Sequence, residues 1–250
     1  MKGYTSKGKW HVTISIALTI CIYMILSWVV GDEIILPTVR SIIENIVDIG
    51  KGPSFLRILG SSLYRSLWGF TISFLLAIVL AIISGVYGPI YYLISPTIKF
   101  LNSVPIIAII LLALIWLNSE MVPMFVGFVM VFPILFETVL KSIVNIDSNL
   151  MEMAKVYKVK NFYIIKDIYM PSIYMGLMNI LPSSMGLNLK MVISGEVLSQ
   201  PKYAIGSNLQ LQKMYLNTSG VFAWIVIILI LGKVLEYLMR GLMRWIKLEK

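Results

Sequence analysis

Three ionisable side chains, Glu137, Lys190 and Glu196, fall within long apolar stretches of this 250-residue sequence. An ionised group at the centre of a bilayer costs roughly 2.5–3.5 kcal/mol, so each should face protein or a water-filled path. Lys190 and Glu196 are six residues apart and cannot pair as i,i+4 neighbours on a helix. On charge grounds we favour a pair between Glu137 and Lys190 across two helices. The alternative is that Glu137, near the end of its stretch, extends to the membrane surface.

Lys190 and Ser194 are the one combination that suggests catalysis. They are four residues apart, so a lysine on the same helix face could deprotonate the serine, as in an intramembrane protease. The only histidine, His11, precedes the first apolar stretch, and neither His-Glu-x-x-His nor Gly-x-Ser-x-Gly occurs. Nothing near Ser194 resembles an oxyanion hole. We therefore predict no catalytic site, and the single cysteine, Cys21, excludes an internal disulfide or a cysteine metal cluster.

A charged segment, residues 147–170, separates two apolar stretches. Asp147 or Ser148 can cap a helix in which Glu152 follows Asn149 by three positions, as in a capping box. The residues alone support two interpretations equally: a helix that rests on lipid headgroups, or one that faces a soluble partner. The predicted helix carries apolar residues among lysines, namely Ala154, Val156, Val159, Phe162 and Ile165, and Pro171 opens the next span.

The composition describes an integral membrane protein. Hydrophobic residues make up 58% of the chain and charged residues 13%, far from the proportions of a soluble domain. The net charge of +9 comes from basic residues grouped at the ends of apolar stretches, which is typical of membrane topology and excludes nucleic-acid binding. No Gly-x-x-x-x-Gly-Lys-Ser/Thr is present, so any ATP chemistry must come from another polypeptide.

Hydropathy predicts six transmembrane spans, since a bilayer core about 30 Å thick needs roughly 20 apolar residues per helix. The first is too long for a signal peptide and lacks a cleavage site, so we expect it to be retained. Pro96 and Pro105 should kink or break the third span. Ala77, Ala81 and Gly85 indicate close helix packing in the second. The predicted spans are 12–30, 62–87, 90–117, 121–146, 171–198 and 218–240.

The distribution of lysine and arginine sets the expected orientation. An even number of spans puts both termini on one side, together with the 147–170 segment, and that side collects most of the basic residues. The positive-inside rule therefore places both termini in the cytoplasm of a multi-pass protein of the cell membrane. Residues 36–49 read as an external amphipathic helix that starts at Pro37, with Ile42, Ile43, Ile46 and Val47 on one face.

The order Glu152-x-Ala154, a turn, and a hydrophobic stretch ending in Pro171 resembles the EAA loop of permease subunits of ATP-binding-cassette (ABC) importers. The resemblance covers about residues 55 to 245. Four further stretches resemble the branch that imports sulfonates, taurine, nitrate or pyrimidine precursors: Ser62-Leu-Tyr-Arg65-Ser-Leu-Trp-Gly69-Phe, Pro105-Ile-Ile-Ala, Phe132-Pro-Ile-Leu-Phe-Glu137-Thr and Gly195-Glu196-Val-Leu.

This resemblance implies an all-α integral membrane protein with the type I importer (MetI-like) fold. It divides the chain into an N-terminal span with its external helix, 1–61, and a permease core, 62–250. A coupling helix at about 150–166 would enter a groove of a separate ATPase subunit, with Glu152 and Ala154 buried there. The residues assigned to this coupling are Glu152, Ala154, Tyr157, Lys158, Phe162 and Pro171.

Two positions depart from the family pattern. Met153 stands where a second alanine is usual, and Lys158 stands where glycine is usual. Glycine supplies backbone freedom at no steric cost, so its absence leaves open whether the turn moves to Asn161, which tolerates positive φ.

The resemblance also implies partners and a transport path. The partners are two copies of an ABC ATPase subunit, an extracytoplasmic substrate-binding protein, a second copy of the chain and the lipid bilayer, with no cofactor. A path for a small organic anion would need hydrogen-bond donors, although the same groups could serve helix–helix contacts. For Glu196, the resemblance favours a structural or gating position near the outer end of its span. The candidates for the path are Asn102, Ser103, Ser183, Ser184, Asn188, Lys190, Ser194 and Glu196.

The remaining alternative is an ATP-independent secondary transporter or channel. Such a protein would show interrupted spans in both halves and charges tied to ion coupling. The clearest polar element here is instead the segment that faces a partner.

Overall fold

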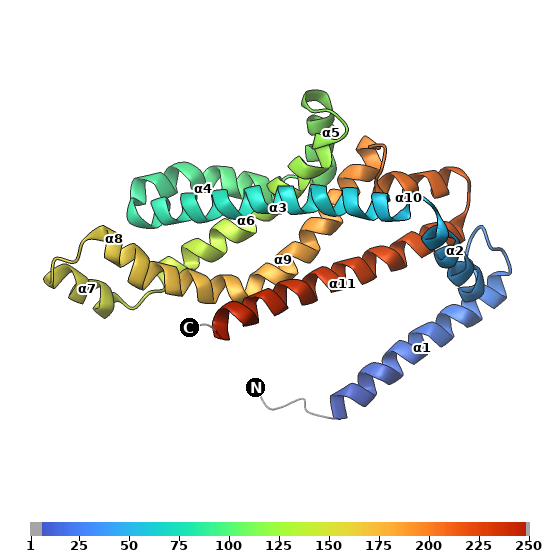
Figure 1. Cartoon of the computed structure of the whole chain (residues 1–250), viewed down its shortest axis with the longest axis horizontal. Helices are drawn as coiled ribbons and strands as arrows, with labels where there is room; N and C mark the ends of the chain where they lie inside the picture. The colour runs from blue at the N-terminus through green and yellow to red at the C-terminus, as the bar shows by residue number, and fades with distance from the viewer. Residues whose placement is uncertain (1–6, 249–250) are drawn as a thin grey trace. The chain divides into compact units, whose positions relative to one another are not determined.

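The computed structural model describes residues 7–248, and every regular element among them is helical, which confirms the predicted all-α fold (Figure 1). The elements are α1 (Lys7–Val30), α2 (Val39–Lys51), α3 (Phe55–Val86), α4 (Gly88–Ser103), α5 (Ile106–Trp116), α6 (Met121–Val144), α7 (Ser148–Val156), α8 (Asn161–Tyr163), the π-helical segment η1 (Ile164–Tyr169), α9 (Met170–Ser199), α10 (Ile205–Met214) and α11 (Thr218–Leu248).

Each predicted span coincides with a helix or a helix pair. Within residues 7–248, four helices are long and apolar enough to cross a membrane: α1, α3, α6 and α11. The pair α4 and α5 would make a fifth span. Helix α9 has 30 residues but is not among these apolar helices, so six spans remain a prediction.

The predicted break in the third span falls at Pro105. Helix α4 ends at Ser103 and α5 begins at Ile106, with a bend of 105° between the two. Proline has no N–H and disfavours helical geometry in the residue before it, which accounts for the interruption. Pro96 lies inside α4 and does not end it.

Contacts divide the chain into two compact units, Met1–Phe55 with Asn208–Ile227, and Leu56–Ser207 with Ile228–Lys250. In the first unit, α2 is capped by Thr38, whose side chain accepts a hydrogen bond from the Ser41 amide, so the helix begins two residues after Pro37. Asn45 of α2 donates to Ser219 Oγ at 3.0 Å. Ile42 of the predicted apolar face is buried, whereas Ile43 on that face is exposed.

Helices α6 and α9 form the centre of the second unit and run antiparallel. A Cβ at Gly127 would lie 2.6 Å from Asn188 Oδ1, and one at Gly195 would lie 2.9 Å from the Cα of Pro123. Glycine therefore allows the two backbones to approach closely, as small residues do in membrane bundles.

Helix α3 packs along α6 in the same direction. Ser73 donates to the Phe128 carbonyl at 2.9 Å, and a Cβ at Gly85 would lie 2.9 Å from Ile143. Ala77 and Ala81 are fully buried in the core cluster of this unit. The predicted small-residue packing of the second span is therefore confirmed.

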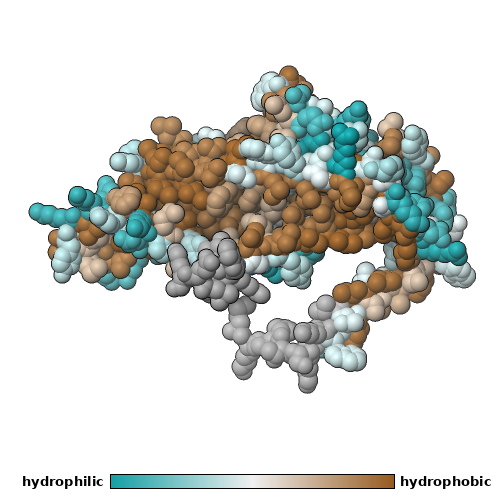
Figure 2. All heavy atoms as spheres, viewed as in Figure 1, coloured by the Kyte–Doolittle hydropathy of each residue, from teal (hydrophilic) through white to brown (hydrophobic). Residues whose placement is uncertain are grey.

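These pairings define two ends of the second unit. The starts of α3 and α6 lie with the end of α9, and the ends of α3 and α6 lie with α7 and the start of α9. Figure 1 shows α7 and α8 beyond the end of α6 and the start of α9. In Figure 2, hydrophobic side chains cover α3 and α4, and hydrophilic ones gather around α7 and α8.

Candidate functional site

The segment assigned to coupling, at about 150–166, consists of two helices, α7 and α8, joined by a turn. Helix α7 is capped by Asp147, which accepts from the Asn149 amide at 2.9 Å, and it ends at Val156. The amide of Lys158 donates to the Lys155 carbonyl at 3.0 Å. The amide of Val159 donates to the Ala154 carbonyl at 2.9 Å. This pair of bonds is the Schellman motif that ends many helices.

Lys158 occupies the left-handed position of this motif, with φ of 51°. Glycine is usual there because a side chain costs roughly 1–2 kcal/mol in that conformation. The turn therefore lies at Lys158, the position where the family usually has glycine, and not at Asn161. Asn161 instead begins α8.

From Asn161 the chain is helical without interruption to Ser199, through α8, η1 and α9. Pro171 lies near the start of α9, as predicted, and the six residues Ile164–Tyr169 before it are π-helical. Proline removes a helical hydrogen bond and clashes with the carbonyl four residues earlier, here that of Asp167. A widened turn relieves such a clash. The turn between α7 and α8 is thus continuous, through α8 and η1, with the 30-residue helix α9.

The turn exposes large apolar side chains outside the spans. The exposed fractions are 78% for Val156, 76% for Tyr157 and 68% for Phe162. We call Met153, Val156, Tyr157 and Phe162 the apolar tip; all four are exposed.

Ala154, unlike the four residues of the apolar tip, is not exposed. It is buried within the chain, beside a cavity of about 490 Å³ that the end of α3 and η1 also line. Glu152 is exposed. Whether an ATPase subunit covers Glu152 and Ala154 together stays a prediction.

The candidates for the transport path separate into two groups. Ser184, Asn188 and Glu196 are buried between helices of the second unit. Asn188 of α9 donates to the Ser66 carbonyl of α3 at 2.6 Å, so it joins two helices. The exposed group lies at the end of α4 and along α9: Asn102, Ser103, Ser183, Lys190 and Ser194.

A buried ion-pair network centres on Arg65, a residue that was not predicted among the ionisable groups within spans. Its Nη1 donates to Glu196 Oε1 at 2.9 Å, and its Nε donates to Glu120 Oε2 at 3.1 Å. Glu196 Oε2 accepts from Ser62 Oγ and from the Gly206 amide, each at 3.0 Å. The network joins α3, α6, α9 and α10 at the end of the unit opposite α7. The stretches around Arg65 and Glu196 that resemble the importer family are the sequence features that could have indicated this network.

The favoured pair between Glu137 and Lys190 is not formed. Glu137 accepts from Lys141 Nζ at 3.1 Å, one turn along α6, and from Asn102 Nδ2 at 3.1 Å. Lys190 lies on α9 near Glu236 of α11, with which it interacts electrostatically. Glu137 therefore forms its ion pair with Lys141, its i,i+4 neighbour on the same helix, and not with a residue of another helix.

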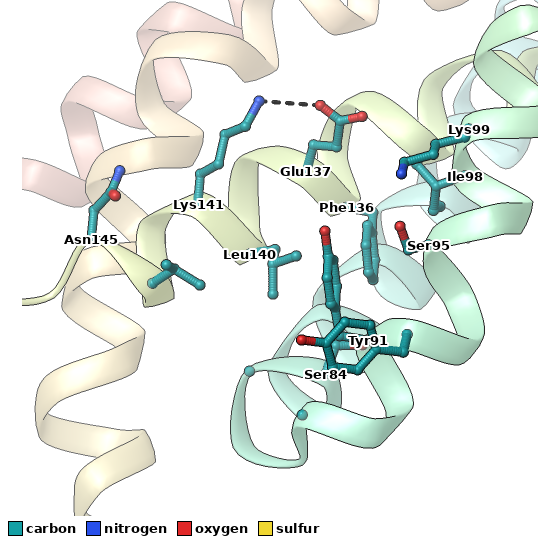
Figure 3. A pocket seen from close by; sticks show the side chains of 14 residues that line it. Ser84, Tyr91, Ser95, Ile98, Lys99, Phe136, Glu137, Leu140, Lys141 and Asn145 are labelled. Carbon is teal, nitrogen blue, oxygen red and sulfur yellow. Dashed lines mark hydrogen bonds and ion pairs between the residues drawn. The ribbon is translucent and has the colours of Figure 1, made fainter.

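A cavity of about 650 Å³ lies between the end of α3, the helix α4 and the second half of α6 (Figure 3). Lys99 and Ser95 of α4 and Glu137 and Lys141 of α6 line it. None of the eight residues expected along the transport path lines this cavity.

Comparison with known proteins identifies the class to which this architecture belongs. The family model for the inner membrane component of binding-protein-dependent transport systems matches residues 73–248. A putative ABC transporter permease of Methanocaldococcus jannaschii is 26% identical over 237 residues, covering 90% of this chain and 85% of the relative. A putative aliphatic sulfonates transport permease of Bacillus subtilis, SsuC, is 22% identical over 236 residues, covering 92% and 85%.

A chain of the inward-facing MetNI methionine ABC transporter has a similar fold. The TM-score is 0.61 at 14% identity, and the match covers 77% of this chain and 98% of the other. The expected type I importer fold is therefore confirmed.

The family match spans more than half of the sequence, so the chain belongs to the inner membrane components of binding-protein-dependent transport systems, the permease subunits of ABC importers. It is accordingly a multi-pass protein of the inner membrane.

Proposed function

We propose that this permease forms the translocation path for a small organic anion and that its apolar tip docks into a separate ATPase subunit. An extracytoplasmic binding protein would deliver the cargo. The name of the Bacillus subtilis relative refers to aliphatic sulfonates, which supports an anionic cargo of that type.

The observation that carries the proposal is the apolar tip. Val156, Tyr157 and Phe162 are exposed on the turn between α7 and α8, outside the long apolar helices. Large exposed apolar groups outside a membrane mark a surface that a partner covers, and tyrosine is prominent among residues that dominate binding energy. The lysines around the turn would supply a polar rim.

The covalent continuity of α8, η1 and α9 supports transmission of a movement. An ATPase that displaces the turn would pull directly on a 30-residue membrane helix. On the other side of the turn, buried Ala154 ties α7 to the end of α3 and η1. ATP binding would thereby open the path outward, and hydrolysis by the partner would reset it.

The proposal extends to the copy number and the orientation of the assembly. Two ATPase copies would engage two copies of this chain, with the path at the two-fold axis. Both termini and the apolar tip would be cytoplasmic by the positive-inside rule, and α2 would be external.

The test is co-purification of the tagged chain with an ABC ATPase subunit. Tyr157→Ala should weaken the complex about tenfold or more, as truncation of a binding hot spot does. The matched control is Tyr215→Ala, because Tyr215 is 72% exposed on the turn between α10 and α11, at the predicted external side. Equal retention of the ATPase by both variants would contradict the proposal, and absence of any ATPase partner would favour an ATP-independent transporter.

A further inference from the structure

We propose that the cavity between α3, α4 and α6 is a binding site for a small organic monoanion with a sulfonate or carboxylate head and a short apolar body. This inference rests on the proposed function, because it names the cargo class and the place where one protomer would hold it. The cavity of about 650 Å³ has the size of a typical ligand site, which is about 300–1,000 Å³.

The charges around the cavity favour an anion. Lys99 lies on the α4 side and Lys141 on the α6 side, and Glu137 supplies the negative charge between them (Figure 3). Glu137 already pairs with Lys141 at 3.1 Å. Within the described chain, no carboxylate forms an ion pair with Lys99. The positive charge of Lys99 therefore has no negative partner in the part of the chain that the structure describes. Lys99 lies on α4, and the pair α4 and α5 is apolar enough to cross the membrane, where an unpaired charge is costly.

The hydrogen-bonding groups of the lining point to the same chemistry. The Ser84 hydroxyl is buried and has no hydrogen-bond partner among residues 7–248. A helical serine normally donates to a carbonyl of the preceding turn, as Ser142 does to Thr138 at 2.8 Å. An acceptor oxygen of a bound ligand would satisfy this donor, and Ser95 and Tyr91 add two further hydroxyl groups to the lining.

The remaining walls suit a short hydrocarbon or aromatic body. Ile98, Phe136 and Leu140 contribute apolar surface, and Tyr91 and Tyr92 pack edge to face with centroids 5.5 Å apart. A polar head beside Lys99 with an apolar remainder against α6 would occupy both kinds of surface. A fully hydrophilic ion such as sulfate would leave the apolar walls uncovered.

The test is titration calorimetry with hexane-1-sulfonate on the purified chain in phosphatidylcholine nanodiscs, which carry no anionic lipid. We expect saturable binding that 1-hexanol and hexylammonium do not reproduce. Equal binding of 1-hexanol would show a merely apolar cavity and would overturn the proposal. The titration is repeated in nanodiscs that contain phosphatidylglycerol, and loss of sulfonate binding there would identify a lipid site and would also overturn the proposal.

Four variants make the test specific to this cavity. Lys99→Met should weaken sulfonate binding about tenfold or more, because a charge-assisted interaction is lost. Ser84→Ala should weaken it about threefold or more, because a neutral hydrogen bond is lost. Glu137→Gln should strengthen binding, because it removes the only carboxylate of the lining and leaves two ammonium groups. The control, Lys51→Met on exposed α2, should bind as the wild type does.

The opposite signs expected for Lys99→Met and Glu137→Gln exclude a general folding defect. Unchanged affinity in Lys99→Met, or weaker binding in Glu137→Gln, would contradict the proposal. ATPase co-purification is measured on the same preparations. An intact complex without sulfonate binding would refute this site alone, whereas sulfonate binding without any complex would refute the ATPase-coupled function and leave the site standing.

Discussion

The guanidinium of Arg65 and the carboxylate of Glu196 form an ion pair, with Nη1 and Oε1 2.9 Å apart, in which both side chains are buried. Arg65 belongs to α3 and Glu196 to the last turn and a half of α9. The pair therefore joins α3 and α9 at the end of the second unit opposite the apolar tip. A coupled movement of α9 must either preserve this contact or break it.

Removal of one partner should be strongly destabilising. Arg65→Met leaves Glu196 buried without its cation, which costs about 3–5 kcal/mol for typical buried pairs. We expect the variant to unfold at clearly lower denaturant concentration in detergent, followed by loss of helical circular dichroism.

The double variant Arg65→Met with Glu196→Gln provides the control for this prediction. It removes both charges, so it should recover part of the lost stability. If the double variant is less stable than Arg65→Met by the full cost of a second independent substitution, the two groups do not act as a pair.

The contact between α6 and α9 should not tolerate a methyl group at Gly127. A Cβ there would lie 2.6 Å from Asn188 Oδ1 and 2.7 Å from Val192 Cγ2, so Gly127→Ala should cost about 1–3 kcal/mol by overpacking. Gly232→Ala is the control, because no atom lies within 4 Å of its added Cβ. The control should be neutral or stabilising by up to about 1 kcal/mol through helix propensity. Equal thermal stability of the two variants would contradict this packing.

Relief of the backbone conformation at Lys158 should stabilise the turn between α7 and α8. Lys158→Gly removes the side-chain penalty at φ of 51°, offset in part by the greater freedom of glycine in the unfolded chain. The expected net gain is about 0.5–1 kcal/mol, seen as slower proteolysis within residues 156–161.

Lys160→Gly is the matched control for that turn. Lys160 has an extended backbone with φ of −65°, so glycine brings no relief there. Faster or unchanged cleavage is expected for Lys160→Gly. If Lys158→Gly is cleaved as fast as Lys160→Gly, the left-handed turn does not limit the stability of this segment.

Much of the fold follows from the sequence because hydrophobic length and proline act locally. The predicted spans 62–87 and 171–198 agree with α3 and α9 to within several residues, and Pro105 breaks the third span as expected. The small residues Ala77 and Ala81 marked a real packing face. Each of these features depends on neighbours a few positions away.

The features that the sequence analysis missed depend on partners far along the chain. Arg65 and Glu196 are 131 residues apart, and only the fold brings them together. The favoured partner for Glu137 was wrong because Lys141, four residues away, satisfies it first. The inward direction of Ala154 and the cavity around Lys99 likewise depend on how α3 packs against its neighbours.

The central claim is that the tip between α7 and α8 couples this permease to ATP hydrolysis. Its most direct test is ATP turnover by the complex in lipid, stimulated by the substrate-binding protein, with wild type compared with Glu152→Arg. This change places a positive charge on exposed α7 beside Lys155 and should abolish the stimulation, whereas Glu33→Arg, on the exposed segment before α2, should leave it intact. Full stimulation in a folded Glu152→Arg complex would contradict the account.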